Sequence, residues 1–235
     1  MARLELNAQL NVARPESLPD RIAGRMRRRM FARFMAEFSP TPDDTLLDVG
    51  ATSDQTLEHS NYAVAWYPHK GRVTTVGLDD ASFLERKYPG VTFRRANGLA
   101  LPFADGSFDY AHSSAVLEHV GSRENQARFI GELARVSRKG FFLTTPNRWF
   151  PVEFHSVLPL VHWLPRTLFW AALRAAGRGA LADEAVLNLL SAGDLAALAH
   201  RAGAFDVRVG AVTLAGWPSN LLLIGRRQAT GGGVL

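Results

Sequence analysis

Apolar side chains recur every four residues across residues 18–38, and arginines occupy much of the opposite face. This period predicts an amphipathic helix, which Pro40 and Pro42 would end. The apolar positions that define the period are Ile22, Met26, Met30, Phe34 and Phe38.

After this helix, short apolar runs alternate with stretches of helical periodicity. Five runs predict buried parallel strands, at residues 45–49, 72–78, 91–95, 108–114 and 140–145. Helical periodicity marks residues 125–136 and 191–204, and Ser191 is expected to cap the second helix. Two further strand patterns close the chain, at residues 205–213 and 219–226.

The alternation predicts an α/β fold in one domain, residues 1–235: a Rossmann-like, seven-stranded, mostly parallel sheet with helices on both faces. A sheet-forming core at 45–145 would be followed by a helical, aromatic-rich insertion at 146–180, after the fifth strand. A helix and a strand hairpin would occupy 191–226, with a tail at 227–235. Because only the segment LAGWP joins the last two strands, the last strand is expected to be antiparallel.

Composition restricts the classes of protein. The chain has 235 residues, a net charge of +5 and no cysteine, which excludes disulfides and thiolate metal sites and fits a reducing compartment. No signal-peptide core and no apolar stretch long enough to cross a bilayer is found, so a cytoplasmic location is expected. The oligomeric state is not indicated.

Much of the positive charge lies on the first helix, which is either a solvated face or a surface for an anionic partner. The arginines concerned are Arg21, Arg25, Arg27, Arg28, Arg29 and Arg33. No nucleic-acid-binding motif accompanies them, so nucleic acid is not expected as a partner.

Open α/β sheets bind ligands beyond the carboxyl ends of their strands, so the residues there are candidates for a binding site. Asp48 can accept from a ligand ammonium or orient the loop, and Gly50 allows close approach of the backbone. Asp79, preferred over Asp80, can accept hydrogen bonds from both hydroxyls of a ribose, and Asn97 can read the edge of an adenine. The remaining candidates for these contacts are Thr52, Gly98, Leu99 and Ser114.

Three features together resemble class I S-adenosylmethionine-dependent methyltransferases of the small-molecule type. They are the turn DVGATSD, the acid after the second strand, and the string NGLALPFADGSFDYAHSSAVLEHV at residues 97–120. The resemblance implies that the 45–145 core binds S-adenosylmethionine and that a methyl group passes in line to a small-molecule, sugar or lipid-linked acceptor.

Further segments resemble a narrower branch of that superfamily, whose members often sit among genes for cell-surface polysaccharide or lipid-linked glycan synthesis. They are SNYAVAWYPHKGRVTTVGLDD, EHVGSRENQARFI and TTPNRWFPVEFHSVLPLVHWLP.

The sequence also departs from the pattern of the resembled family. Thr52 and Asp54 stand where the motif DxGxGxG has its second and third glycines, and Asn97 stands where an aspartate is usual. Asp48 and Asp79 are farther apart than the roughly 20 residues of a simple βαβ unit, and the extra residues are expected at 60–70. These departures keep a second hypothesis open, a non-catalytic binding protein with the methyltransferase fold.

Transfer to a hydroxyl or amine also requires a group that accepts a proton. His119, after the fourth strand, is expected to face the cleft as a general base or as a structural histidine. Glu118 either binds substrate or fixes a loop. Glu153 and His155 would act together on substrate if their segment is extended, because residues i and i+2 then share a side; the alternative is a structural salt bridge.

Arg148 is expected to bind a carboxylate or phosphate of the substrate or to pair with Glu153, and Trp149 is a further candidate for substrate contact. The insertion that they open is interpreted as a lid packed over the sheet, as the lining of a substrate pocket, or as a peripheral contact with a membrane surface. Its aromatic residues include Trp149, Phe150, Phe154, Trp163, Phe169 and Trp170.

Three other functions are weaker interpretations. No two of the seven histidines have the H-x-x-x-H spacing, so no metal site is predicted. A nicotinamide-dependent oxidoreductase would need G-x-G-x-x-G after the first strand, where the chain has GATSDQ. An RNA methyltransferase would suit the basic charge, but no appended RNA-binding module is present.

Overall fold

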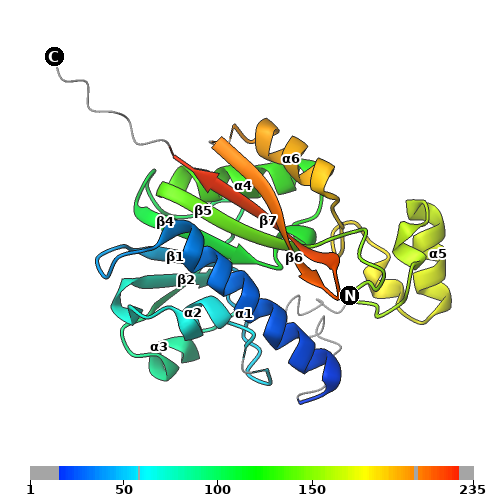
Figure 1. Ribbon diagram of the computed structural model, residues 1–235, viewed down its shortest axis with the longest axis horizontal. Coiled ribbons are helices and arrows are strands. Elements are labelled where there is room, and N and C mark those ends of the chain that lie inside the picture. Colours follow the sequence, from blue (N-terminus) through cyan, green and yellow to red (C-terminus); the bar gives the residue numbers. More distant parts are fainter. Residues whose placement is uncertain (1–15, 58, 204–205, 228–235) are drawn as a thin grey trace.

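Seven strands form one sheet in the computed structural model, which describes residues 16–57, 59–203 and 206–227 (Figure 1). The order across the sheet is β3-β2-β1-β4-β5-β7-β6. All neighbours pair in parallel except β7, which is antiparallel to both β5 and β6, as predicted. The strands are β1 (Leu46–Val49), β2 (Val73–Gly77), β3 (Thr92–Arg95), β4 (Phe108–Ser114), β5 (Ser137–Pro146), β6 (Asp206–Leu214) and β7 (Trp217–Arg226).

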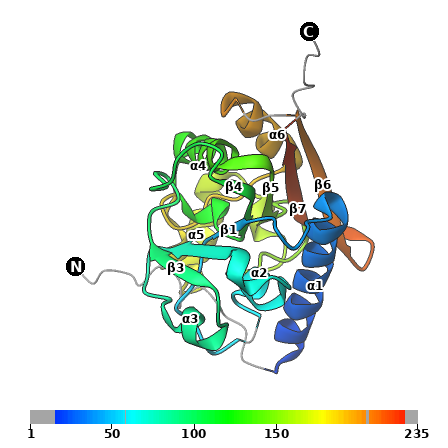
Figure 2. The ribbon, with the colours of Figure 1, turned by 90° about the vertical axis from the view of Figure 1, so that its left-hand side faces the viewer.

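Helices cover both faces of this sheet, with α1 on one face and α4 and α6 on the other (Figures 1 and 2). The α-helices are α1 (Leu18–Phe38), α2 (Tyr62–Trp66), α3 (Phe83–Lys87), α4 (Arg123–Val136), α5 (Arg166–Ala175) and α6 (Ala192–Arg201). Short 3-10 helices are η1 (Lys70–Arg72), η2 (Leu117–His119), η3 (Val161–Trp163) and η4 (Gly179–Leu181). In the described part of the chain, no helix has both the length and the apolar character needed to cross a membrane.

Strict alternation along the strands builds two separate cores. Leu46 of β1 packs with α1 and α2, while Leu47 packs with α4 and α6 on the opposite face. On β5, Phe142 joins the first core and Phe141 the second. Because both faces are buried, the strands read as continuous apolar runs, which is the pattern that indicated a parallel sheet.

Strand ends differ from the prediction where hydrogen bonding between neighbouring strands, rather than local composition, sets the length of the strand. The sequence predicts that the five residues LAGWP connect the last two strands. In the structure only Ala215 and Gly216 form the turn, with φ values of 50° and 82°. Such a turn extends the hairpin ladder to Leu214 and Trp217, beyond the apolar run. Residues 60–70 contain α2 and the start of η1, as expected for the long connection between β1 and β2. Of the predicted strands and tail, residues 205 and 228–235 lie outside the described residues.

The insertion after β5 contains η3, α5 and η4 and lies at one end of the sheet (Figure 1). Its apolar side chains form a small core of their own rather than continuing the cores of the sheet. Members of this core include Phe169, Leu173, Leu181, Val186 and Leu189. The insertion is therefore an appended helical unit, not a lid that packs flat on the sheet.

A buried carboxylate, Asp109, joins the amino ends of β1 and β4. It accepts hydrogen bonds from Thr45 N at 3.0 Å and from Arg138 Nη2 at 2.7 Å, and Lys139 Nζ lies 3.2 Å away. Burial alone would raise the pKa of Asp109, but these bonds lower it to about 2. An aspartate in the unfolded chain titrates near 3.9. The bonds therefore stabilise the fold above that pH, and the stabilisation is lost as the pH falls from about 4 to about 2.

We expect Asp109→Asn to lower the free energy of unfolding at neutral pH by roughly 2 kcal/mol and to reduce the stability change between about pH 4 and pH 2, to which Glu153, with a pKa of about 2, also contributes. Urea denaturation at a series of pH values measures both effects. Asp43→Asn is the matched control, because the Asp43 side chain is 90% exposed. An unchanged acid transition in Asp109→Asn would show that another carboxylate governs it.

Candidate cofactor pocket and active site

A pocket of about 280 Å³ lies at the carboxyl ends of β1, β2 and β4. The parallel strands bring residues that are far apart in the sequence to this edge. The predicted cofactor contacts that line the pocket are Gly50, Thr52, Asn97, Gly98, Leu99 and Ser114. Asp48, Asp79 and Asp80 are not among the lining residues.

The turn after β1 is ordered by side chains where the family motif has glycines. Gly50 has a φ of 116°, and a Cβ there would lie 2.1 Å from Val116, so the position accepts only glycine. Thr52 Oγ1 accepts from Asp54 N at 3.1 Å, and Asp54 in turn accepts from Ser60 Oγ at 3.0 Å. These bonds fix a loop that flexible glycines would leave mobile.

The backbone amides of this turn are already used. Gly50 N and Ala51 N both donate to Val76 O at 2.8 Å, and Thr52 N donates to Asn61 Oδ1 at 3.0 Å. These three amides are therefore not free to donate to a ligand. Gly50 contributes close approach of the backbone rather than a free donor.

Asp48 faces the interior of the sheet rather than the pocket. Its Oδ1 lies 2.7 Å from His112 Nδ1, and His112 Nε2 lies 3.2 Å from the hydroxyl of Tyr62. All three residues are buried, and burial raises the pKa of Tyr62. Since the Asp48 carboxylate is occupied by His112, its predicted contact with a ligand ammonium is corrected to a buried structural role.

The two acids after β2 differ in what they already bind. Asp80 Oδ1 accepts from Ser82 N at 2.9 Å, and this bond lowers the pKa of Asp80. Asp79 makes no hydrogen bond with any described residue, although Gly77 and Leu78 just before it line the pocket. Asp79 thus keeps its carboxylate available at the pocket edge, and its ribose contact stays a prediction.

Asn97 and Leu99 form the pocket wall after β3. Asn97 Oδ1 accepts from Leu99 N at 2.9 Å, so the side chain is held in a tight turn. Its amide nitrogen makes no hydrogen bond with a described residue and remains a donor for a ring nitrogen. Leu101, two residues further along, is 5% exposed and belongs to the core under α4.

Arg27 is a pocket residue that the sequence did not reveal. It lies on α1, in the arginine run expected to face solvent, yet it lines the pocket and its Nη1 contacts His59 Nδ1. Burial lowers the pKa of Arg27, but an arginine remains charged. Among the described lining residues it carries the permanent positive charge. Apolar lining residues were also missed, among them Leu78, Val116, Val120 and Phe129.

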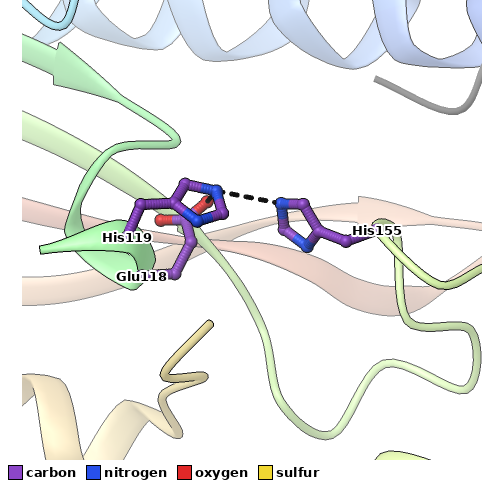
Figure 3. A group of neighbouring side chains, drawn as sticks. All are labelled: Glu118, His119 and His155. Atoms are coloured by element: carbon purple, nitrogen blue, oxygen red, sulfur yellow. Dashed lines mark hydrogen bonds and ion pairs between the residues drawn. The ribbon is translucent and has the colours of Figure 1, made fainter. Parts of the chain in front are cut away.

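His119 and His155 both line the pocket, as the sequence suggested for a catalytic wall (Figure 3). Their Nε2 atoms are 3.1 Å apart. Glu118 is completely buried behind them and accepts from Thr145 Oγ1 at 2.9 Å. Glu118 therefore does not reach the pocket surface, and its predicted direct contact with substrate is corrected to support of this wall.

Glu153 meets His155 in a turn, not across an extended segment. Glu153 Oε1 accepts from the backbone N of His155 at 2.8 Å and lies 2.7 Å from its Nδ1. Burial would raise the pKa of Glu153, but its bonds with His155 and Ser156 lower it to about 2. Since Glu153 is 3% exposed and outside the pocket lining, it orients His155, and of the two residues only His155 lines the pocket.

Arg148 and Trp149 lie outside the main pocket, and their contact with substrate stays a prediction. Arg148 lines a separate hollow of about 40 Å³ beside His162. It forms no ion pair with Glu153, whose described partners are His155 and Ser156. Trp149 is 48% exposed, and its carbonyl accepts from Trp217 Nε1 at 3.0 Å. Both residues follow β5 into the insertion, which carries them away from the strand ends.

The strand order, the antiparallel last strand and the pocket at the carboxyl ends are those of a Rossmann-like α/β fold. Solved structures share the fold. One chain of the Haloferax volcanii complex with the Trm112 methyltransferase activator is 15% identical, with a TM-score of 0.59, over 96% of this chain and 99% of that one. An S-adenosylmethionine-dependent methyltransferase of Mesorhizobium loti is 19% identical, with a TM-score of 0.54, over 83% and 98%.

The sequence comparisons agree with the fold. Residues 47–144 match the methyltransferase domain family, and S-adenosylmethionine is the cofactor of such domains. A Mycolicibacterium smegmatis (strain ATCC 700084 / mc(2)155) protein named "Probable S-adenosylmethionine-dependent methyltransferase" is 37% identical over 81 residues. The match covers 33% of this chain and 30% of that relative. Haemonchus contortus phosphoethanolamine N-methyltransferase 2, solved with S-adenosylmethionine, is 18% identical with a TM-score of 0.52, over 79% of this chain and 39% of that one.

Proposed function

We propose that this protein catalyses transfer of a methyl group from S-adenosylmethionine to a small-molecule, sugar or lipid-linked acceptor. One observation carries the proposal: a single pocket joins the predicted cofactor contacts after β1, β3 and β4 to the imidazoles of His119 and His155. A protein that only binds the cofactor has no need of basic side chains on the same wall.

The lining residues fit the cofactor chemically. Gly50, Gly77 and Gly98 leave the floor of the pocket bare, and a Cβ at Gly98 would lie 2.4 Å from Phe129. Asn97 offers an amide donor to an adenine edge, and Leu99 an apolar surface for the ring. Asp79 at the pocket edge suits two ribose hydroxyls. The guanidinium of Arg27 suits the carboxylate of the methionine part.

The cofactor supplies a methyl group that its sulfonium makes electrophilic. The residues of the chain hold the reactants in line and exclude water, and such alignment accounts for about 7–11 kcal/mol of barrier reduction at best. His119 and His155 stand where an acceptor hydroxyl or amine gives up its proton. Glu153 and the Val186 carbonyl, which His119 Nδ1 approaches to 2.6 Å, fix the orientation of the two rings.

An acceptor with a lipid part is favoured by the surface beside the pocket. The loop that carries His155 also exposes apolar side chains: Phe154 is 37% exposed, Val157 50% and Leu160 49%. Leu164 and Leu168 add exposed apolar surface further along the insertion. Apolar side chains in a loop beside arginines suit the interface of a membrane, where a lipid-linked acceptor resides, so the proposal includes peripheral contact with a membrane.

Cofactor binding tests the first half of the proposal. We expect Arg27→Gln to bind S-adenosylmethionine about ten- to a hundredfold more weakly, because a hydrogen bond to a charged group contributes about 1.5–3 kcal/mol. Calorimetry of the full chain measures the affinity. Arg25→Gln, an exposed arginine of the same helix, should bind like the wild type. Equal affinities for all three proteins would remove Arg27 from the cofactor site.

Transfer itself is tested with tritiated S-adenosylmethionine and a bacterial extract depleted of nucleic acid. Label in the organic phase supports a lipid-linked acceptor, and label in the aqueous small-molecule fraction supports a soluble one. Cofactor binding without transfer to either fraction would favour the second candidate, a binding protein that keeps the fold.

A further inference from the structure

Glu118, His119 and His155 form a cluster in which one potential ligand atom of each residue lies within 4.8 Å of the others (Figure 3). The first two residues lie on η2, and His155 comes from the insertion. The two imidazole Nε2 atoms face one another at 3.1 Å. Whether two nitrogen atoms at this distance attract or repel each other depends on which of them carries a hydrogen.

The hydrogen bonds of the two rings indicate which nitrogen of each neutral ring carries the hydrogen. His119 Nδ1 lies 2.6 Å from the carbonyl oxygen of Val186, which can only accept. His155 Nδ1 lies 2.7 Å from Glu153 Oε1, which also accepts from the backbone N of His155. Both Nδ1 atoms therefore carry the hydrogen, and in the neutral rings both Nε2 atoms present lone pairs. Two lone pairs at this distance repel unless a cation lies between them.

A buried carboxylate oxygen also indicates a cation at this position. Glu118 is completely buried, and its Oε1 has no hydrogen-bond partner among the described residues. This oxygen lies 3.9 Å from His119 Nε2. An ionised oxygen without a partner in the interior is costly, and a bound cation would remove that cost.

We propose that Glu118, His119 and His155 bind a divalent transition-metal ion, through one carboxylate oxygen and two Nε2 atoms. Two imidazoles with a carboxylate select Zn²⁺, Co²⁺ or Fe²⁺ over Mg²⁺ or Ca²⁺. Nitrogen ligands about 2.1 Å from one metal ion lie about 3.0–3.4 Å from each other, which matches the observed separation of the Nε2 atoms. The absence of an H-x-x-x-H pair concealed this site in the sequence.

The groups behind the three ligands complete the arrangement. Metal-binding imidazoles usually donate their other N–H to a carboxylate or a carbonyl, and here Glu153 and Val186 accept those hydrogens. Thr145 donates to the second oxygen of Glu118. Both histidines line the pocket, so the open side of the ion would face the acceptor. With the ion bound, both Nε2 lone pairs are used, so the histidines would hold the acceptor through the metal instead of accepting its proton; a metal-bound hydroxyl is more acidic and would lose that proton to water. This role rests on the proposed function, whereas metal binding does not.

A proton is the competing occupant. Burial lowers the pKa of His119. Burial also opposes charge on His155, but its bond to Glu153 and the charges of Glu153 and Glu118 raise the pKa of His155. A single imidazolium between the rings would satisfy both lone pairs without metal, so the experiment has to separate a metal ion from a proton.

Metal binding is measured on the full chain, stripped with chelator and free of any histidine tag. Co²⁺ is titrated while its visible absorption is followed, and Zn²⁺ then competes. Because the chain has no cysteine, thiolate bands cannot interfere. We expect one ion per chain in the wild type and in His200→Ala, an exposed histidine, and loss of the band in His155→Ala. Glu153→Gln should weaken binding about ten- to a hundredfold.

Circular dichroism checks that His155→Ala is folded. If that variant is unfolded, the weaker metal binding expected for Glu153→Gln serves as the test instead. Asp79→Ala should lose the cofactor but keep the metal, which separates failure of this proposal from failure of the proposed function. Absence of stoichiometric Co²⁺ and Zn²⁺ binding, or equal binding by His155→Ala, would overturn the metal site. Nitrogen NMR showing hydrogens on both nitrogens of His155 under these conditions would assign the position to a proton instead.

Discussion

The Asp79→Ala variant is expected to bind S-adenosylmethionine at least about a hundredfold more weakly than the wild-type chain. Asp79 follows β2 at the pocket edge and makes no hydrogen bond with any described residue, so its carboxylate is available to a ligand. Two hydrogen bonds from ribose hydroxyls to an ionised acid contribute about 1.5 kcal/mol each or more, and the loss of both corresponds to about a hundredfold. Isothermal titration calorimetry measures the change.

Asp80→Ala is the matched control for this variant. Asp80 is the adjacent acid, but its carboxylate already accepts from Ser82 N at 2.9 Å. Its loss should leave cofactor affinity near that of the wild type while lowering stability slightly. A large loss in Asp80→Ala with none in Asp79→Ala would exchange the roles of the two acids. No loss in either variant would mean that the ribose contact lies elsewhere.

Phe34→Ala is expected to lower the free energy of unfolding by about 3–5 kcal/mol, as is usual for a large aromatic residue in a core. Phe34 lies on α1 and is fully buried against the sheet, and its ring centroid lies 5.6 Å from that of His112 and 5.7 Å from that of Phe142. The melting temperature should fall by roughly 6–20 °C for a chain of this size. Urea and thermal denaturation measure the two quantities.

Arg33→Ala serves as the neighbouring control. The Arg33 side chain is 50% exposed and lies 3.7 Å from Glu37, a surface pair that contributes at most about 0.5 kcal/mol. If Phe34→Ala were no more destabilising than Arg33→Ala, α1 would not belong to the cooperative core. That result would also affect the pocket, because α1 holds Arg27 against it.

The packing of α1 on the sheet both stabilises the fold and positions a residue of the pocket. Met30 and Phe34 anchor α1 on the face formed by β1, β4 and β5, and this packing places Arg27, about one turn earlier, at the pocket. The helix therefore contributes to both the core and the cofactor site. An arginine run gave no sign of which member would turn inward, since all six have the same chemistry.

The sequence by itself determined the elements, their order and the edge of the sheet where ligands bind. Alternating apolar runs and helical periods are local properties, and the right-handed, parallel connections that follow from them leave few topologies. Residues at strand ends, such as Gly50, Asn97 and Ser114, could therefore be assigned to one pocket before their positions were known.

Only the tertiary structure decided how side chains from distant segments meet. In the folded chain Asp48 contacts His112, and Glu153 contacts His155. Glu118 is buried behind the two histidines that line the pocket. The insertion carried Arg148 and Trp149 away from the pocket but delivered His155 to His119. Apart from the near neighbours Glu153 and His155, whose pairing their spacing already suggested, these contacts depend on packing between elements, which has no period in the sequence and which no spacing rule predicts.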